Sequence, residues 1–524
     1  MYRPYYIKSL NHGWEIGQEP RLISGFSSLV NARVEKGKLI KRPGYALKAT
    51  TGNGNPIVGI SKCYNQGPAD LLVADTRRLY RFEPVQSTLT ELTSGDTFTG
   101  TDWQYFQFVS WQNRTYMTNF SDKLYVYYDT DTVSEVSTGI DIERAQHMFI
   151  WKNRMFIMNI VENSTEWYPS RLRWSDVLQA QVTPATVNFP EDNYIDGEFQ
   201  SRDDVPMLIR FFRGVPYVFF KDFAVRIESS RVSSELFTFG DPIEGYGSIA
   251  QNFGVRTKNG IVILNQRNID LFDGYRGQAI DLPQLRDLVD TFDNRKWHCI
   301  QGCRAGEKNR IYMTYAEDGQ NVPNKILEWS VPDNTFSSAG IAMNYIYGFD
   351  GFYQPNWLVA PHVYDDDYAA DGTTDPTNLD LTNEFQFRTT PTTYGGSATG
   401  SIYDLNSGTD YAGSAYAVEA ISGRFNPFEE KGLSCDLARI EFLVDTDATA
   451  SFSCSVYKDW SSTEFYTKTV TCSGNDTKHW ETVQCDGETG NSFRFKISHT
   501  AKANSPVIHA VRVWLKEGGP AWQR

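Results

Sequence analysis

Short runs of alternating apolar and polar residues, separated by turn-forming residues, fill the first two thirds of the 524-residue chain. The pattern is clearest in residues 108–119 and 148–159, which share the order Trp-x-Asn-Arg-x-aromatic at a spacing of 40 residues. In both copies an apolar run enters a polar turn and a second run leaves it, which is the pattern of a β-hairpin. The chain therefore repeats a hairpin unit.

Weaker copies of this unit lie on both sides of the two clear ones. They are found at residues 69–74, 210–220, 257–264 and 307–315. Each of the six copies is followed by another short run that alternates apolar with polar or charged residues, as a half-buried strand does. These runs are residues 78–82, 123–127, 171–174, 224–227, 269–272 and 326–329. Units at intervals of roughly 40–60 residues, each with about four strands, favour a β-propeller over an open stack of hairpins.

The whole chain is predicted to be all-β and to have four parts. These are an extended N-terminal arm at 1–50, a propeller of about six blades at 51–345, an acidic loop or insertion at 346–415 and a β-sandwich at 416–524. The sandwich follows from the alternation that returns near Tyr416. Residues 176–203 are predicted to be an inserted loop. The best helical candidate is a short stretch from Leu282 to Phe292.

Composition and charge narrow the possible partners. No run of 18 apolar residues occurs, so no membrane span is expected. Residues 1–6 lack the apolar core of a secretory signal, which favours a product that is not exported. The net charge of −14 argues against a surface that grips nucleic acid through its phosphates. It is compatible with a surface that DNA slides past, or with simple solubility.

The seven cysteines include no Cys-x-x-Cys pair, so free thiols are expected. Pairing among the last four, Cys435, Cys454, Cys472 and Cys485, is the alternative. His298, Cys299 and Cys303 do not have the spacing of a zinc site, and buried thiols on a strand are the favoured interpretation.

Residues 326–387 contain ten acids and no Lys or Arg. A solvated linker is the favoured interpretation of this stretch. The alternatives are an acidic loop that faces a channel and a calcium-binding loop around Asp365, Asp366 and Asp367. The run lacks the fixed spacing of an EF-hand, so no metal is predicted.

No catalytic or cofactor motif is found along the chain. The acids Asp176, Asp222, Asp270 and Asp273 stand in no motif that separates them from turn formers. We therefore predict no catalytic, cofactor-binding or metal-binding residues, and a protein that is not an enzyme.

The repeated tryptophans and Asn-Arg pairs have structural explanations. Trp111 and Trp151 could stack a sugar, but packing between blades is the favoured role. Asn113, Asn153 and Asn309 stand where a turn needs positive φ. The arginines that follow them, Arg114, Arg154 and Arg310, would then enter the next strand.

The opening of the chain carries a family resemblance. Its motifs are residues 13–20, Gly25-Phe26, residues 31–34 (Asn-Ala-Arg-Val) and residues 37–45 (Gly-Lys-Leu-Ile-Lys-Arg-Pro-Gly-Tyr). This opening resembles the start of podoviral bacteriophage tail nozzle proteins, also called tail tubular protein B. Residues 492–499 and 508–514 look like the closing strands of that family, so the resemblance covers most of the chain thinly.

The resemblance implies a structural virion protein of the viral tail, assembled in the host cytoplasm. It implies a homo-oligomeric ring, a hexamer, through which viral DNA is retained and then ejected. The partners would be the head–tail adaptor protein and distal tail or fibre proteins. The arm and the sandwich would supply contacts between subunits. Two alternatives remain open, which are a propeller glycosidase or depolymerase acting on host polysaccharide and a propeller lectin that binds a receptor.

Overall fold

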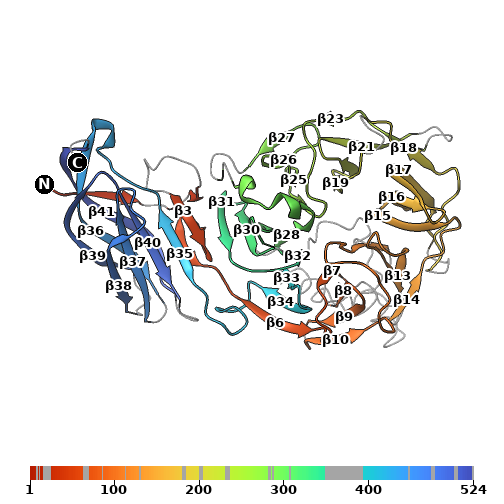
Figure 1. The fold of residues 1–524 in the computed structure, drawn as a ribbon, viewed down its shortest axis with the longest axis horizontal. Helices are drawn as coiled ribbons and strands as arrows, with labels where there is room; N and C mark the ends of the chain where they lie inside the picture. The colour runs from red at the N-terminus through yellow and green to blue at the C-terminus, as the bar shows by residue number, and fades with distance from the viewer. Residues whose placement is uncertain are drawn as a thin grey trace, which may run out of the picture.

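The computed structural model of the chain is elongated, with a propeller at one end and a unit of two sheets at the other (Figure 1). Both chain ends lie in the two-sheet unit, at its far end from the propeller. The structure describes residues 1–7, 10, 12–15, 25–62, 70–84, 86–111, 114–128, 131–179, 185–199, 204–230, 236–280, 285, 288–305, 309–320, 322–348, 393–446, 449–473, 478–500 and 505–521.

Seven blades, each with four strands in one path, surround one axis in the described part of the chain. From the innermost strand outward, blade 1 contains β7 (Ile57–Lys62), β8 (Leu71–Asp75), β9 (Leu79–Glu83) and β10 (Thr88–Glu91). Blade 2 contains β11 (Gln107–Trp111), β12 (Arg114–Thr118), β13 (Tyr125–Tyr128) and β14 (Thr132–Glu135). Blade 3 contains β15 (Ile142–Trp151), β16 (Arg154–Glu162), β17 (Glu166–Val177) and β18 (Tyr194–Asp196). Blade 4 contains β19 (Leu208–Phe212), β20 (Val215–Phe219), β21 (Phe223–Ser229) and β22 (Phe237–Phe239), and β23 (Ile243–Glu244) also pairs with β21. Blade 5 contains β24 (Gly254–Arg256), β25 (Ile261–Leu264), β26 (Ile269–Phe272) and β27 (Gly277–Ala279). Blade 6 contains β28 (Gly302–Ala305), β29 (Arg310–Tyr315), β30 (Lys325–Ser330) and β31 (Thr335–Ala339).

The predicted β-propeller is confirmed strand by strand. The six repeated hairpin copies supply the second strand of blades 1 to 6, and the six alternating runs supply the third strand of the same blades. The alternation arises because one face of each blade packs on the next blade. Trp111, 4% exposed, lies in a core shared by blades 2 and 3, and Trp151 packs on the core between blades 3 and 4.

The seventh blade is built from two distant parts of the chain. Its strands are β32 (Tyr345–Gly348), β33 (Thr393–Gly396), β34 (Ser401–Leu405) and β6 (Tyr45–Thr50). The outermost strand, β6, comes from the N-terminal region and pairs antiparallel with β34, with Leu47 opposite Tyr403. The first part of the chain therefore closes the ring against the last blade.

The structure differs from the predicted division of the chain at three places. Residues 1–50 are not an extended arm, because 45–50 complete blade 7 and the described strands before them pair in other sheets. Residues 346–415 contain β33 and β34, so this stretch is not only a loop, and the blades number seven where about six were expected. Residues 176–203 contain β18, the outer strand of blade 3. The Asp365–Asp367 run lies outside the described residues.

Two further sheets make up the other end of the molecule. One contains β39 (His479–Gly490), β36 (Leu433–Asp445), β41 (Val507–Pro520), β5 (Lys38–Lys41) and β4 (Ala32–Glu35), with β1 (Arg3–Ile7) on β41. The other contains β3 (Gly25–Val30), β35 (Val418–Ser422), β40 (Phe493–His499), β37 (Ala450–Lys458) and β38 (Glu464–Cys472), with β2 (Gly13–Trp14) on β3.

The core of this unit joins the two sheets. The Phe442 ring, from one sheet, lies 5.3 Å from Phe452 and 5.7 Å from Phe495, which belong to the other. Strands from the N-terminal region join both sheets, so the unit does not consist of residues 416–524 alone. The predicted β-sandwich at 416–524 is therefore not confirmed as a unit of those residues.

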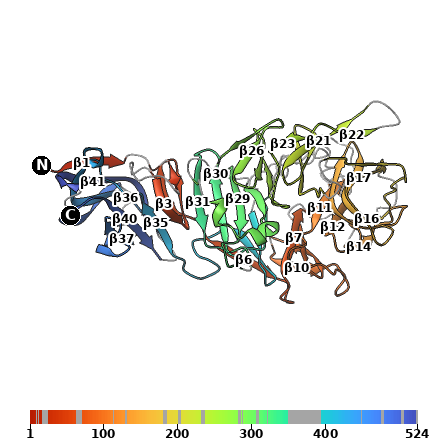
Figure 2. The same cartoon turned by 45° about the horizontal axis from the view of Figure 1, so that its top comes forward.

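The second of these sheets runs without a break into the propeller. Its strand β3 pairs in parallel with β31 of blade 6, with Val30 opposite Ser338. The turned view shows the row β30, β31, β3, β35, β40 and β37 across the molecule (Figure 2). Backbone hydrogen bonds therefore join the propeller to the two-sheet unit.

Helical structure among the described residues is limited to short 3₁₀ turns: η1 (Val289–Thr291), η2 (Asn294–Cys299) and η6 (Glu429–Lys431). The predicted helix from Leu282 to Phe292 is thus wrong over its described part, which forms only η1 as a helical turn. Six cysteines are described and all are free and buried, including the four of the C-terminal region. Cys299 ends η2 and is not on a strand, whereas Cys303 lies on β28.

Candidate functional site

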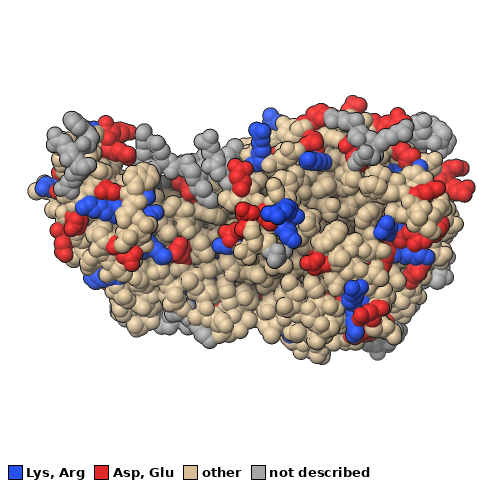
Figure 3. Space-filling view, viewed as in Figure 1, with Lys and Arg blue, Asp and Glu red and all other residues tan. Residues whose placement is uncertain are grey.

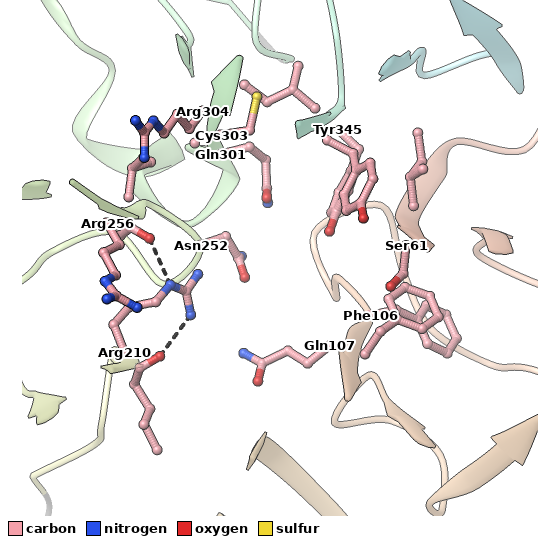
Figure 4. A pocket seen from close by; sticks show the side chains of 18 of the residues that line it. Ser61, Phe106, Gln107, Arg210, Asn252, Arg256, Gln301, Cys303, Arg304 and Tyr345 are labelled. Carbon is pink, nitrogen blue, oxygen red and sulfur yellow. Dashed lines mark hydrogen bonds between the residues drawn. The ribbon is translucent and has the colours of Figure 1, made fainter. Parts of the chain in front are cut away.

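A cavity of about 410 Å³ lies on the propeller axis (Figure 4). Residues on or next to the innermost strand of every blade line it. These strands converge because the ring is closed, so residues far apart in the sequence face one space. A volume near the lower end of the range of small-molecule sites, roughly 300–1,000 Å³, makes this cavity the candidate site.

Three arginines give the cavity its charge. Arg210, Arg256 and Arg304 are each the third residue of the innermost strand of blades 4, 5 and 6. Neither Asp nor Glu is among the described residues that line the space. The site is therefore basic, in contrast to the acidic chain around it.

Arg210 is held by backbone carbonyls. Its Nε donates to Gly254 O at 2.7 Å, and a terminal nitrogen donates to Ile209 O at 2.8 Å. Gly254 leaves room here, because a Cβ at that position would lie 2.4 Å from Leu208 Cδ2 and 3.0 Å from Arg210 Cγ, and these side chains would have to shift. The innermost strands can thus approach closely enough to fix the guanidinium at the axis.

Burial shifts the pKa values of the axial groups but leaves their charges at neutral pH unchanged. It lowers the pKa of Arg210 to about 10, so the guanidinium stays charged at neutral pH. Burial also raises the pKa of Tyr345 to about 12, against the opposing effect of the Arg210 charge. Tyr345 therefore presents a neutral hydroxyl that can donate a hydrogen bond.

Amide side chains complete the polar lining. Gln107 Nε2 contacts Nδ1 of the buried His147 at 3.1 Å, and His147 Nε2 contacts Pro206 O at 2.8 Å. The carbonyl can only accept, so Nε2 carries the proton and Nδ1 accepts from the amide. Burial lowers the pKa of His147 to about 4, which keeps the ring neutral near pH 7. A neutral histidine thus orients Gln107.

Gln301 also belongs to the lining, and the residue is 3% exposed. Its amide interacts with the hydroxyl of the neighbouring buried Tyr105. Figure 4 shows the Gln301 and Asn252 side chains directed into the same space as Arg210.

The acids considered from the sequence do not meet at the axis. Asp176 accepts a hydrogen bond from Asn188 at 2.6 Å, and Asp222 accepts one from Gln266. Asp270, on blade 5, accepts from Asn265 at 2.9 Å. Asp273 caps a turn by accepting from two backbone N–H groups at 3.0 Å each, as its sequence predicts. The paired carboxylates of a glycosidase are thus not found among the residues that line the cavity.

The repeated Asn-Arg pairs have the predicted structural role in part. Asn153 and Asn309 have φ of 57° and 50°, as their turns require. Asn113 lies outside the described residues. Arg154 donates to Ser175 O at 2.7 Å on the neighbouring strand. Arg310, however, turns into a buried charge cluster.

That cluster surrounds Glu328 at the base of blade 6. Arg33, Arg42 and Arg310 contact its carboxylate at 3.2, 3.2 and 2.5 Å. Burial alone would raise the pKa of Glu328, but the three positive charges outweigh burial and lower this pKa to about 2. Glu35 adds a second carboxylate at 2.6 Å from Arg310. The cluster is structural, since Glu328 is 1% exposed.

The axial site was not predicted from the sequence. Arg210, Arg256 and Arg304 look like ordinary polar positions of alternating strands, and only ring closure brings them together. A weak signal exists in the repeat itself, because an arginine falls at the same strand position in three successive blades.

No family model matches the chain, and no curated protein matches it. Two similar solved structures are a candidate gluconolactonase (8% identity, TM-score 0.31, covering 70% of this chain and 92% of that one) and the extracellular domain of a candidate one-component system from B. thetaiotaomicron (8% identity, TM-score 0.40, covering 84% and 47%). The chain thus spans about half of the second protein. No helix in the described part of the chain is long and apolar enough to cross a membrane.

One prediction has to be corrected from these comparisons. The chain was expected not to be an enzyme, and the propeller described as a candidate gluconolactonase contradicts that expectation, because it bears the name of an enzyme. The missing motifs therefore do not exclude catalysis. The likeness by itself assigns no reaction to this chain.

Proposed function

We propose that this chain is a structural subunit of a bacteriophage tail nozzle. The observation that carries the proposal is the position of residues 31–45, where the resemblance to nozzle proteins is densest. These residues form the junction between the propeller and the two-sheet unit. The resemblance therefore involves residues that determine the architecture of the whole chain.

The contacts of this segment explain its residue types. Asn31 donates to Ala417 O at 2.7 Å and accepts from the Tyr411 hydroxyl at 2.6 Å. Arg33 and Arg42 reach Glu328 in blade 6. A side chain at Gly44 would place Cβ 1.8 Å from Asp410 O, so only glycine fits there. These four residues of the motif thus help to hold the two units together.

A fused body of this kind suits a subunit that bears load in a ring. In the proposal, copies of the chain, six in number, surround a channel in the virion tail and retain the genome until ejection. The head–tail adaptor protein would lie above the ring and distal tail or fibre proteins below it. Assembly would take place in the host cytoplasm.

Charge supports a channel that does not hold DNA tightly. The net charge is −14, and Figure 3 shows acidic and basic residues interspersed on the visible face, without a continuous basic stripe. Binding through phosphates needs clustered Lys and Arg, because released counterions supply most of the affinity. Like charges would instead let the DNA backbone pass.

Labelling of virus particles tests this proposal. Antibodies against the purified chain, coupled to gold, would be imaged on particles of the virus that encodes it. We expect label only on the tail, between the adaptor and the distal tail or fibre proteins. Particles that carry no label, although the same antibodies detect the chain in infected cells, would contradict the proposed function.

A further inference from the structure

We propose that the cavity on the propeller axis binds a monosaccharide acid, with its carboxylate on Arg210 and its hydroxyl groups on the surrounding amides. This inference is independent of the nozzle proposal, because it concerns a site within one subunit. It also differs from a lectin that carries one sugar in each blade, since the propeller of each chain has a single axial site.

The charge of the cavity selects an anion. Three arginines from successive blades line it, and no described Asp or Glu does. No described carboxylate forms an ion pair with Arg210, and no carboxylate affects its pKa. Arg210 is only half-buried, but a positive charge that is partly removed from water without a counter-charge is still costly, and an anionic ligand would offset that cost.

Hydrogen-bonding groups in the cavity point to a ligand with several hydroxyls. The Gln301 side chain is buried and points into the same space as Arg210 (Figure 4). Asn252, Gln107 and Tyr345 add groups of both kinds from three other blades. A bare inorganic anion would leave most of these groups unused, whereas a sugar ring can engage them together.

The walls and the volume of the cavity suit a sugar ring. Phe106 and Phe108, stacked at 5.9 Å between centroids, and Phe149 line the space with apolar faces. Aromatic walls with a few polar groups are typical of small-molecule sites of this volume. The guanidinium fork favours planar carboxylates as bidentate partners, so we assign a carboxylate to the anionic end of the ligand.

Isothermal titration of the full chain with D-glucuronate tests the assignment, with D-glucose and inorganic phosphate as comparison ligands. We expect saturable binding of one glucuronate per chain that weakens as salt is raised. Glucose and phosphate should each bind at least tenfold more weakly. Equal affinity for glucose would overturn the role of the arginines, and equal affinity for phosphate would overturn the assignment of a sugar.

Two variants test whether the ligand binds in the cavity. Arg210→Gln should weaken glucuronate binding at least tenfold, and Arg256→Gln should weaken it as well. The second variant serves if the first does not fold, because Arg256 lies on the innermost strand of a different blade. The control is Arg226→Gln, whose arginine lies on β21 outside the cavity and pairs with Glu228 at the surface. Unchanged affinity in the folded cavity variants, or an equal loss in the control, would overturn the site.

Discussion

Arg42 and Glu328 are 286 residues apart in the sequence, yet Nε and Oε2 lie 3.2 Å apart with both side chains 1% exposed. Arg42 follows β5 in the two-sheet unit, and Glu328 lies on β30 in the propeller. With Arg33 and Arg310, the pair forms a buried cluster at the boundary of the two units. The stability of the junction should therefore depend on ionised Glu328.

Replacing Glu328 by glutamine should destabilise the protein by about 3–5 kcal/mol, because three buried guanidinium groups lose the carboxylate between them. Unfolding by guanidinium chloride measures the change. The matched control is Glu228→Gln, which breaks the exposed pair with Arg226 and should cost less than about 1 kcal/mol. Equal losses in both variants would contradict the structural importance of the cluster.

Acid should weaken the same junction in a defined pH range. Glu328 has a pKa of about 2 in the folded protein against an ordinary value of 4.5, so its contribution is complete above pH 4.5 and is lost as pH falls towards 2. Unfolding free energies measured across this range should fall more steeply for the parent than for Glu328→Gln. Parallel pH profiles would show that Glu328 does not have this depressed pKa.

His147 should make stability depend on pH in a higher range. Its pKa falls from 6.5 to about 4 in the folded protein, so the unfolded chain binds the proton more readily and folding loses stability between pH 6.5 and 4. The loss should reach roughly 3 kcal/mol. His147→Gln should remove this part of the pH dependence. Denaturation at pH 7, 5.5 and 4 measures it, and an unchanged slope in the variant would contradict the buried neutral histidine.

Gly44 tests the fit of the junction without any change of charge. Alanine there would place Cβ 1.8 Å from Asp410 O, so the backbone must move and the melting temperature should fall by several degrees. Gly340→Ala is the control, because the only atom near its added Cβ is Asn31 Nδ2 at 4.0 Å. Thermal unfolding of both variants decides. A similar small effect in both would mean that the junction tolerates displacement.

The propeller could be predicted because its second and third strands form local hairpins. Alternation in runs such as 224–227 and 269–272 depends on neighbouring residues, so it is visible in the sequence. Blade 7 could not be found in this way. Its outer strand, β6, lies about 350 residues before its partner β34, and local periodicity carries no information on such pairing.

The site and the junction were missed for the same physical reason. Arg210, Arg256 and Arg304 converge only when the ring closes, and Arg310 resembled a turn-following arginine until Glu328 and the N-terminal segment surrounded it. The expected extended arm was also wrong. Gly37 forms the turn between β4 and β5 with a φ of 73°, and Gly44 packs against the Asp410 backbone, so these residues do not mark a free segment.

Electron microscopy of the purified chain, alone and mixed with the adaptor protein of the same virus, tests the central claim most directly. The nozzle proposal predicts rings of one symmetry with a central pore, at six times the 59.6 kDa mass of the chain. Single elongated particles that never join into rings, even with the adaptor present, would contradict it.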